Sequence, residues 1–201
     1  MTVTAVRKDA AALTLTLTAE FDASPARVWE LWADPRQLER WWGPPTWPAT
    51  FTSHDLAPGS HVEYHMTGPT GDEAHGYWDI VEADPPNRLV FIDGFAGDDG
   101  TPNDDFPRNE GRVTIESISA GRSRMSIESH FSSTDAMEQV LGMGMEGTFR
   151  AVGFFTVGGR RRGGRRGDRC ESATAPRTGR AGPSRGRWRQ GWRSRGARDR
   201  E

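Results

Sequence analysis

The 201-residue chain has one cysteine, Cys170, and therefore cannot form a disulfide bond within itself. It also has no long apolar run. No segment approaches the roughly 20 apolar residues that a membrane-spanning helix needs, and none near Met1 matches the core of a signal peptide. These absences exclude a disulfide-stabilised secreted scaffold and predict a cytoplasmic protein without membrane association.

Lysine is almost absent, since Lys8 is the only one among 26 basic residues. The charge is also distributed unevenly. Residues 1–156 contain 11 basic and 24 acidic side chains, whereas residues 157–201 contain 15 basic and 4 acidic ones. The formal net charge of -2 thus combines an acidic body with a basic tail. We predict one folded domain over residues 1–156 and a disordered Arg/Gly-rich tail over residues 157–201.

The tail contains 15 arginines and 10 glycines but no leucine, isoleucine, phenylalanine or methionine, so it cannot build a packed core. Trp188 and Trp192 lie between arginines. Stacking of these rings on bases and contact of the arginines with phosphates predict weak, nonspecific, salt-dependent nucleic-acid binding. A shifted reading frame would give the same composition without any function, and both explanations remain open.

The segment 21–45 is the richest in large apolar side chains and predicts two short helices. Ser24-Pro25 is typical of a helix start, and Asp34-Pro35 of a helix end. The residues that form an apolar stripe at helical spacing are Val28, Leu31 and Trp32 in the first helix and Leu38, Trp41 and Trp42 in the second. These rings are expected either to fill the core or to close one end of a pocket.

Alternating apolar and polar residues predict strands through most of the remaining body. Leu13–Phe21 alternates leucine with threonine, the pattern of a half-buried strand. The other predicted strands cover residues 51–55, 61–66, 77–82, 88–93, 112–119 and 124–131. Residues 94–109 form a predicted polar loop, and short turns join most other strands. One antiparallel sheet of about six or seven strands is therefore expected.

A final helix is predicted to begin at Asp135, with Glu138 as its capping-box partner, and to run on through Phe155. Its apolar face consists of Met137, Val140, Leu141 and Met145. The predicted fold class is α+β, with a curved antiparallel sheet wrapped around a long C-terminal helix and two short helices after the first strand. Such an arrangement leaves room for a cavity between sheet and helix.

Several motifs occur in a characteristic order over about residues 10–150. They are Phe21-x3-Pro25-x2-Val28-Trp29, Trp32-x-Asp34-Pro35, Leu38-x2-Trp41-Trp42, the Gly59 turn, Pro85-x2-Arg88-Leu89, His130-Phe131 and Gly144-Met145-Glu146. Together they resemble the START-like (SRPBCC, helix-grip) superfamily, and within it the family related to the C-terminal domain of the activator of Hsp90 ATPase. The resemblance implies the helix-grip fold and leaves several functions open, because members include carriers of apolar ligands, chaperone regulators and polyketide cyclases.

The resemblance and the strand alternation together predict an apolar cavity facing the last helix. The candidate ligand-binding residues are Trp42, Tyr64, Met66, Trp78, Phe91, Met137, Leu141 and Met145. Side chains of these types lie more often in the core than in a ligand site, so core packing is the alternative for each of them.

Three other motifs resemble cofactor or metal-binding sequences, but their context does not support those functions. Gly142, Gly144 and Gly147 spell G-x-G-x-x-G, but they lie in a predicted helix instead of a βαβ unit, so no cofactor is expected. His61 and His65 are four residues apart on a predicted strand, which separates them by about 13 Å at roughly 3.3 Å per residue and argues against a zinc site. The acidic loop residues Asp98, Asp99, Asp104 and Asp105 match no EF-hand spacing.

No Ser-His-Asp or Cys-His arrangement can be assembled from the sequence, so no catalytic residue is predicted. We expect a protein that binds a small apolar molecule or, alternatively, a chaperone. A polyketide-cyclase-like enzyme using the same cavity is the second hypothesis, and nucleic-acid binding by the tail is the third.

Overall fold

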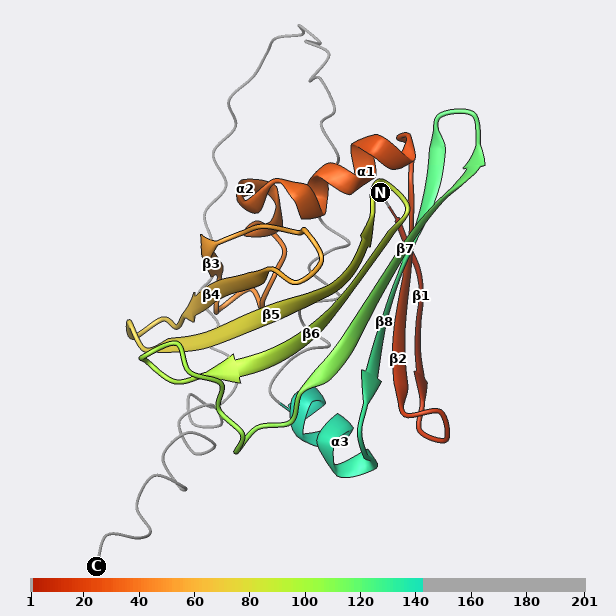
Figure 1. Cartoon of the computed structure of the whole chain (residues 1–201). Helices are drawn as coiled ribbons and strands as arrows, with labels where there is room; N and C mark the ends of the chain where they lie inside the picture. The colour runs from red at the N-terminus through yellow and green to blue at the C-terminus, as the bar shows by residue number, and fades with distance from the viewer. Residues whose placement is uncertain (1, 143–201) are drawn as a thin grey trace, which may run out of the picture. The chain divides into compact units, whose positions relative to one another are not determined.

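The computed structural model describes residues 2–142, which form a strongly curved antiparallel sheet with short helices (Figure 1). The strands are β1 (Thr2–Asp9), β2 (Thr14–Phe21), β3 (Ala49–Ser53), β4 (His61–Thr67), β5 (Glu73–Asp84), β6 (Arg88–Ala96), β7 (Asn109–Ser119) and β8 (Arg122–Phe131). The helices are α1 (Pro25–Ala33), α2 (Pro35–Leu38) and α3 (Thr134–Gly142). The predicted boundary between body and tail lies outside the described residues. Within residues 2–142, no helix is both long and apolar enough to span a bilayer.

The sheet contains eight strands in the order β1-β2-β8-β7-β6-β5-β4-β3. The α+β class and the single antiparallel sheet are confirmed, but the expected six or seven strands were too few. The missed strand is β1, an edge strand whose residues are mostly exposed, so it lacks the apolar alternation that marks a half-buried strand. The predicted loop 94–109 is also too long, because β6 extends to Ala96 and β7 begins at Asn109.

The two predicted short helices are present, and Asp34 separates them. Its extended backbone ends α1, while its side chain accepts a hydrogen bond from the Arg36 backbone N–H at 2.9 Å and so caps α2. Ser24 occupies the N-cap position of α1, but its side chain makes no capping hydrogen bond. The regular helix α2 ends at Leu38, yet the backbone N–H of Trp42 still bonds to the Leu38 carbonyl at 2.9 Å.

The start of α3 corrects one prediction. Ser133, not Asp135, caps this helix, because its Oγ accepts a hydrogen bond from the Ala136 backbone N–H at 3.1 Å. The predicted apolar face is present in Met137 and Val140, which are buried. The expected continuation to Phe155 lies outside the described residues.

One face of the sheet, here called the core face, packs against α1 and α2. The strand residues of this face that are buried in the core are Leu15, Leu17, Ala19, Phe21, Phe51, Val62, Tyr64, Trp78, Ile80, Leu89, Phe91, Val113, Ile115, Met125 and Ile127. Two glycines in this face lie directly opposite aromatic rings across the strands. A Cβ on Gly76 would lie 2.4 Å from the Tyr64 ring, and one on Gly111 would lie 2.6 Å from the Phe91 ring. Glycine therefore lets both rings lie flat against the sheet.

Candidate functional site on the core face

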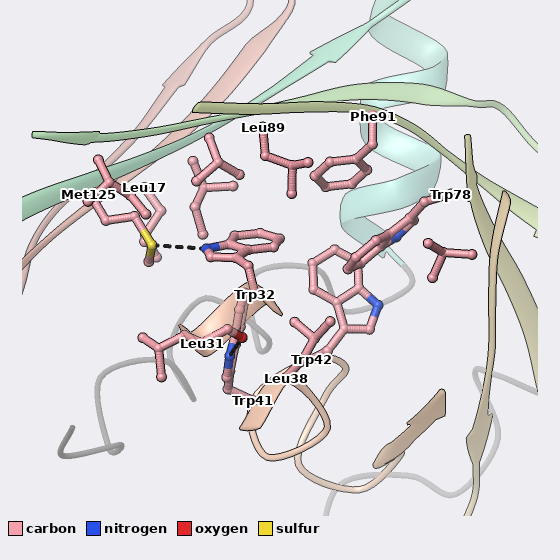
Figure 2. Close-up of a cluster of buried hydrophobic side chains, with 14 of the residues drawn as sticks. Leu17, Leu31, Trp32, Leu38, Trp41, Trp42, Trp78, Leu89, Phe91 and Met125 are labelled. Carbon is pink, nitrogen blue, oxygen red and sulfur yellow. Dashed lines mark hydrogen bonds between the residues drawn. The ribbon is translucent and has the colours of Figure 1, made fainter. Parts of the chain in front are cut away.

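Four aromatic side chains of the predicted site meet on the core face. Trp42 follows α2, whereas Tyr64, Trp78 and Phe91 come from the adjacent strands β4, β5 and β6. The ring centroids of Trp42 and Trp78 are 4.7 Å apart, and those of Trp78 and Phe91 are 4.5 Å apart. Figure 2 shows the two indoles next to each other, near Phe91 and Leu89. We call Trp42, Tyr64, Trp78 and Phe91 the aromatic cluster.

The other four predicted residues are placed less uniformly. Met137 of α3 is fully buried in the same core, while Met66 and Leu141 are partly buried against it. Met145 lies outside the described residues. The structure thus brings together most of the predicted set, although these contacts alone do not distinguish a ligand site from core packing.

Asp93 of β6 adds a carboxyl group to this apolar surface. It follows Leu89 and Phe91 at two-residue steps, so it lies on the same face of the strand. The Tyr64 hydroxyl donates a hydrogen bond to Asp93 Oδ1 at 3.0 Å. The residue keeps some accessible surface, but its carboxyl is desolvated by burial, and its cross-strand partner on β7 is the buried Asn109.

Burial governs the acid–base properties of this pair. Desolvation raises the pKa of Asp93 from the ordinary 3.8 to about 7, although the hydrogen bond from Tyr64 and the proximity of the Trp78 indole N–H act in the opposite direction. Burial also raises the pKa of Tyr64 well above its ordinary value, and the charge of Asp93 adds to that effect. Near neutral pH, Asp93 can consequently either accept a proton or release one.

Two indole N–H groups next to the pair have no hydrogen-bond partner. Trp42 Nε1 and Trp78 Nε1 are both buried, and neither reaches an acceptor with normal geometry in the described part of the chain. They lie close enough to Tyr64 to favour its ionised form, but without the alignment of a hydrogen bond. By contrast, Trp32 Nε1 reaches Met125 Sδ at 3.3 Å and Trp41 Nε1 reaches the Leu31 carbonyl at 3.3 Å. Unpaired buried donors are rare in native proteins and mark sites where an acceptor is expected.

Sequence reasoning missed Asp93, although a signal for it was present. The predicted strand 88–93 alternates Leu89, Phe91 and Asp93 on one face, which places a carboxylate where an apolar residue is expected. The sequence did not reveal the hydrogen bond to Tyr64, because that contact depends on the register of three strands.

The described residues also line two further hollows. One has a volume of about 400 Å³ and lies beside His54, where burial lowers the pKa of the imidazole. Its other lining residues are Trp29, Ala33, Asp55, Leu56, Ala57, Pro58, Ala83 and Pro85. The second hollow has a volume of about 290 Å³ and includes His65 and His75.

Comparisons with known proteins agree with this architecture. Residues 22–152 match the family model described as Activator of Hsp90 ATPase homolog 1-like protein. A crystal structure of a Mycobacterium smegmatis protein is 44% identical, with a TM-score of 0.66 over 75% of this chain and 94% of that one. An NMR structure of an Arthrobacter aurescens protein is 47% identical, with a TM-score of 0.71 over 75% of this chain and 88% of that one.

More distant structures share the fold alone. A Staphylococcus epidermidis protein solved by NMR is 19% identical, with a TM-score of 0.62 over 73% of this chain and 90% of that one. A search of the curated proteins finds no match.

Proposed function

Since the chain belongs to the family of activator of Hsp90 ATPase homolog 1-like proteins, we propose that it binds a small, largely apolar molecule on the core face, with the molecule's polar group held at Asp93. Membership of this START-like family supports ligand binding or a regulatory role in general terms. The Asp93–Tyr64 pair beside the aromatic cluster carries the more specific proposal.

The energetics of burial support a ligand-related role for this pair. Placing a carboxyl among apolar side chains is unfavourable unless hydrogen bonds compensate, and Asp93 has one such bond, from Tyr64. If Asp93 served only for packing, an apolar residue of similar size at this position would give a more stable fold. A ligand that hydrogen-bonds to Asp93 would supply the missing compensation.

The surrounding groups define the chemistry of the expected ligand. The aromatic cluster offers flat apolar surfaces for a ring-bearing body. Trp42 Nε1 and Trp78 Nε1 are donors that need an acceptor, whereas ionised Asp93 is an acceptor that needs a donor. A hydroxyl or amide group satisfies both requirements, while an anionic carboxylate would face the charge of Asp93 at alkaline pH.

The test compares Asp93→Asn with Asp79→Asn in the full chain, using the neutral apolar dye Nile red and native mass spectrometry. Asp79 lies on the adjacent strand β5 but pairs with His61 on the opposite face. We expect a retained small molecule in the native protein, blue-shifted dye emission, and at least a threefold change in dye affinity for Asp93→Asn, about 0.65 kcal/mol. Asp79→Asn should bind as the native chain does.

Either of two results would contradict the proposal. One is an absence of both dye binding and a retained molecule. The other is an equal effect of the two substitutions, which would assign the change to charge or stability instead of a local contact.

A second candidate function is catalysis on the same bound molecule. The observation that favours it is the near-neutral pKa of Asp93, since a general acid or base works best near the operating pH. A polyketide-cyclase-like reaction would use Asp93 to move a proton while the aromatic cluster holds the substrate. If Asp93→Asn lost turnover but kept its affinity for the dye, the role of Asp93 would be catalytic instead of ligand binding.

Chaperone regulation draws its support from the description of the family. Nucleic-acid binding by residues 157–201 remains a prediction from charge and composition, and those residues lie outside the described part of the chain.

A further inference from the structure

The outer face of the sheet, opposite Asp93, brings two histidines together. His65 of β4 and His75 of β5 are direct cross-strand partners. Cross-strand partners project to the same side of a sheet, and these two ring centroids are 5.9 Å apart. The four-residue spacing of His61 and His65 on one strand argued against a site formed by that pair, and in the structure His61 contacts Asp79 at 2.6 Å.

Two carboxylates approach the same histidines. Glu73 precedes His75 by two residues on the same face, and its oxygens lie 3.9 Å from His65 Nε2 and 3.6 Å from His75 Nε2. Asp98, in the loop after β6, places Oδ1 4.0 Å from His75 Nε2. Three segments of the chain thus contribute four metal-ligating groups to one location.

The spacing of these groups is slightly wider than a bound metal requires. Zinc bonds of about 2.0–2.2 Å place tetrahedral ligand atoms roughly 3.3–3.6 Å apart. Within residues 2–142, no group of three or more His, Cys, Asp or Glu side chains is already arranged to hold a metal ion. The observed separations of 3.6–4.0 Å would have to shorten by a few tenths of an ångström.

The two carboxylates have the most room to make this adjustment. The exposed fractions are 48% for Glu73 and 98% for Asp98, against 21% for His65 and 26% for His75. Their mutual contacts are at ion-pair distance and do not compete as strong hydrogen bonds would. Rotation of Glu73 and Asp98 would bring their oxygens closer to the two imidazoles.

The surroundings favour a cation. The hollow of about 290 Å³ includes His65, His75 and Asp98, and it is also lined by Glu63 and Asp99. Among the described residues that line this hollow, none is lysine or arginine. A positive ion entering it meets the carboxylates of Glu63, Asp98 and Asp99.

We propose that His65, His75, Glu73 and Asp98 form a binding site for a divalent transition metal ion of the zinc class. Two imidazoles with carboxylates suit Zn²⁺, whereas Ca²⁺ and Mg²⁺ prefer oxygen ligands throughout. The bound ion would tie the loop containing Asp98 to β4 and β5.

The test is calorimetric titration of Zn²⁺ into the metal-free full chain carrying Cys170→Ser, which removes the one thiol. We expect one ion per chain, with the affinity reduced at least about tenfold in His65→Ala and in His75→Ala. His61→Ala is the matched control, because it removes a histidine from the same strand and face and should leave the affinity unchanged. Co²⁺ should give the intense visible absorption of four-coordinate geometry, and this absorption should disappear in both test variants.

Three results would overturn the proposal. They are the absence of stoichiometric zinc binding, an affinity unchanged in His65→Ala and His75→Ala, and an equal loss in His61→Ala. Circular dichroism of each variant establishes that the fold is retained, so a lost affinity reports on the site. The readouts do not involve Nile red or Asp93, so this experiment tests the metal site independently of the proposed function.

Discussion

Asp93 differs in kind from the other polar side chains buried on the core face. Ser123 is fully buried but donates a hydrogen bond to the Ala23 carbonyl at 2.6 Å, which compensates for the desolvation of its neutral hydroxyl. Asp93 carries an ionisable group whose charged form is disfavoured by its surroundings. Its contribution to stability therefore depends on pH.

The stability of the fold should fall as the pH rises through the titration of Asp93. Because its folded pKa of about 7 exceeds the ordinary 3.8, the native state binds the extra proton between these values and the unfolded state does not. The favourable contribution is complete below pH 3.8 and lost by about pH 7 to 8. Relative to Asp93→Asn, the native chain should lose roughly 2–4 kcal/mol over this interval.

Urea unfolding of both chains at pH 4.5 and pH 8 measures this difference. Asp105→Asn, which alters an exposed carboxyl, is the control and should show no such trend. A free-energy gap between native and Asp93→Asn that stays constant with pH would show that Asp93 is not desolvated.

The corner between α1 and α2 depends on one capping side chain. Asp34 accepts hydrogen bonds from the Arg36 backbone N–H at 2.9 Å and from Gln37 Nε2 at 3.0 Å. A further link runs from α2 to β3, since Glu39 Oε1 accepts a hydrogen bond from the Phe51 backbone N–H at 3.0 Å. The corner positions Trp42, so its geometry matters for the aromatic cluster.

Asp34→Ala should destabilise the protein by about 1 kcal/mol, because it leaves the first turn of α2 uncapped. Ser24→Ala is the matched comparison: Ser24 also occupies an N-cap position, but its side chain makes no capping bond, so its loss should change stability by less than about 0.5 kcal/mol. Chemical unfolding of the two variants gives both values. Equal destabilisation would mean that the observed cap bond does not contribute.

The sheet as a whole combines local and distant pairings. From β3 to β8, each strand pairs with its neighbour in the chain, and β1 pairs with β2. Only the β2–β8 pairing joins segments about a hundred residues apart, for example at Leu17 and Ile127. Closing so long a loop is entropically unfavourable, so this pairing is expected to form late in folding.

Leu17→Ala and Leu89→Ala test this order, because both leucines are fully buried but only Leu17 lies at the distant pairing. Each substitution should destabilise the protein by about 2–5 kcal/mol. The loss should appear mainly as faster unfolding in Leu17→Ala and as slower folding in Leu89→Ala, measured by stopped-flow tryptophan fluorescence. A larger decrease of the folding rate in Leu17→Ala would reverse the proposed order.

Local sequence patterns were sufficient to locate most of the helices and strands. Alternation located β2, and Asp34-Pro35 located the break between α1 and α2, because both signals act within a few residues. The same reasoning missed β1, because this edge strand is mostly exposed and therefore lacks the apolar alternation of a half-buried strand. It also named Asp135 as the cap of α3, whereas the cap is Ser133; both residue types suit that position.

The aromatic members of the candidate site were likewise within reach of the sequence, because side chains two residues apart share a strand face. The sequence did not show which strands are neighbours or in what register they pair. The approach of Asp93 to Tyr64 and the pairing of His65 with His75 follow from hydrogen-bonded ladders between different strands. A one-residue shift in such a ladder would move every side chain to the opposite face. Composition and periodicity therefore determine what each strand presents, and the assembled sheet determines which side chains meet.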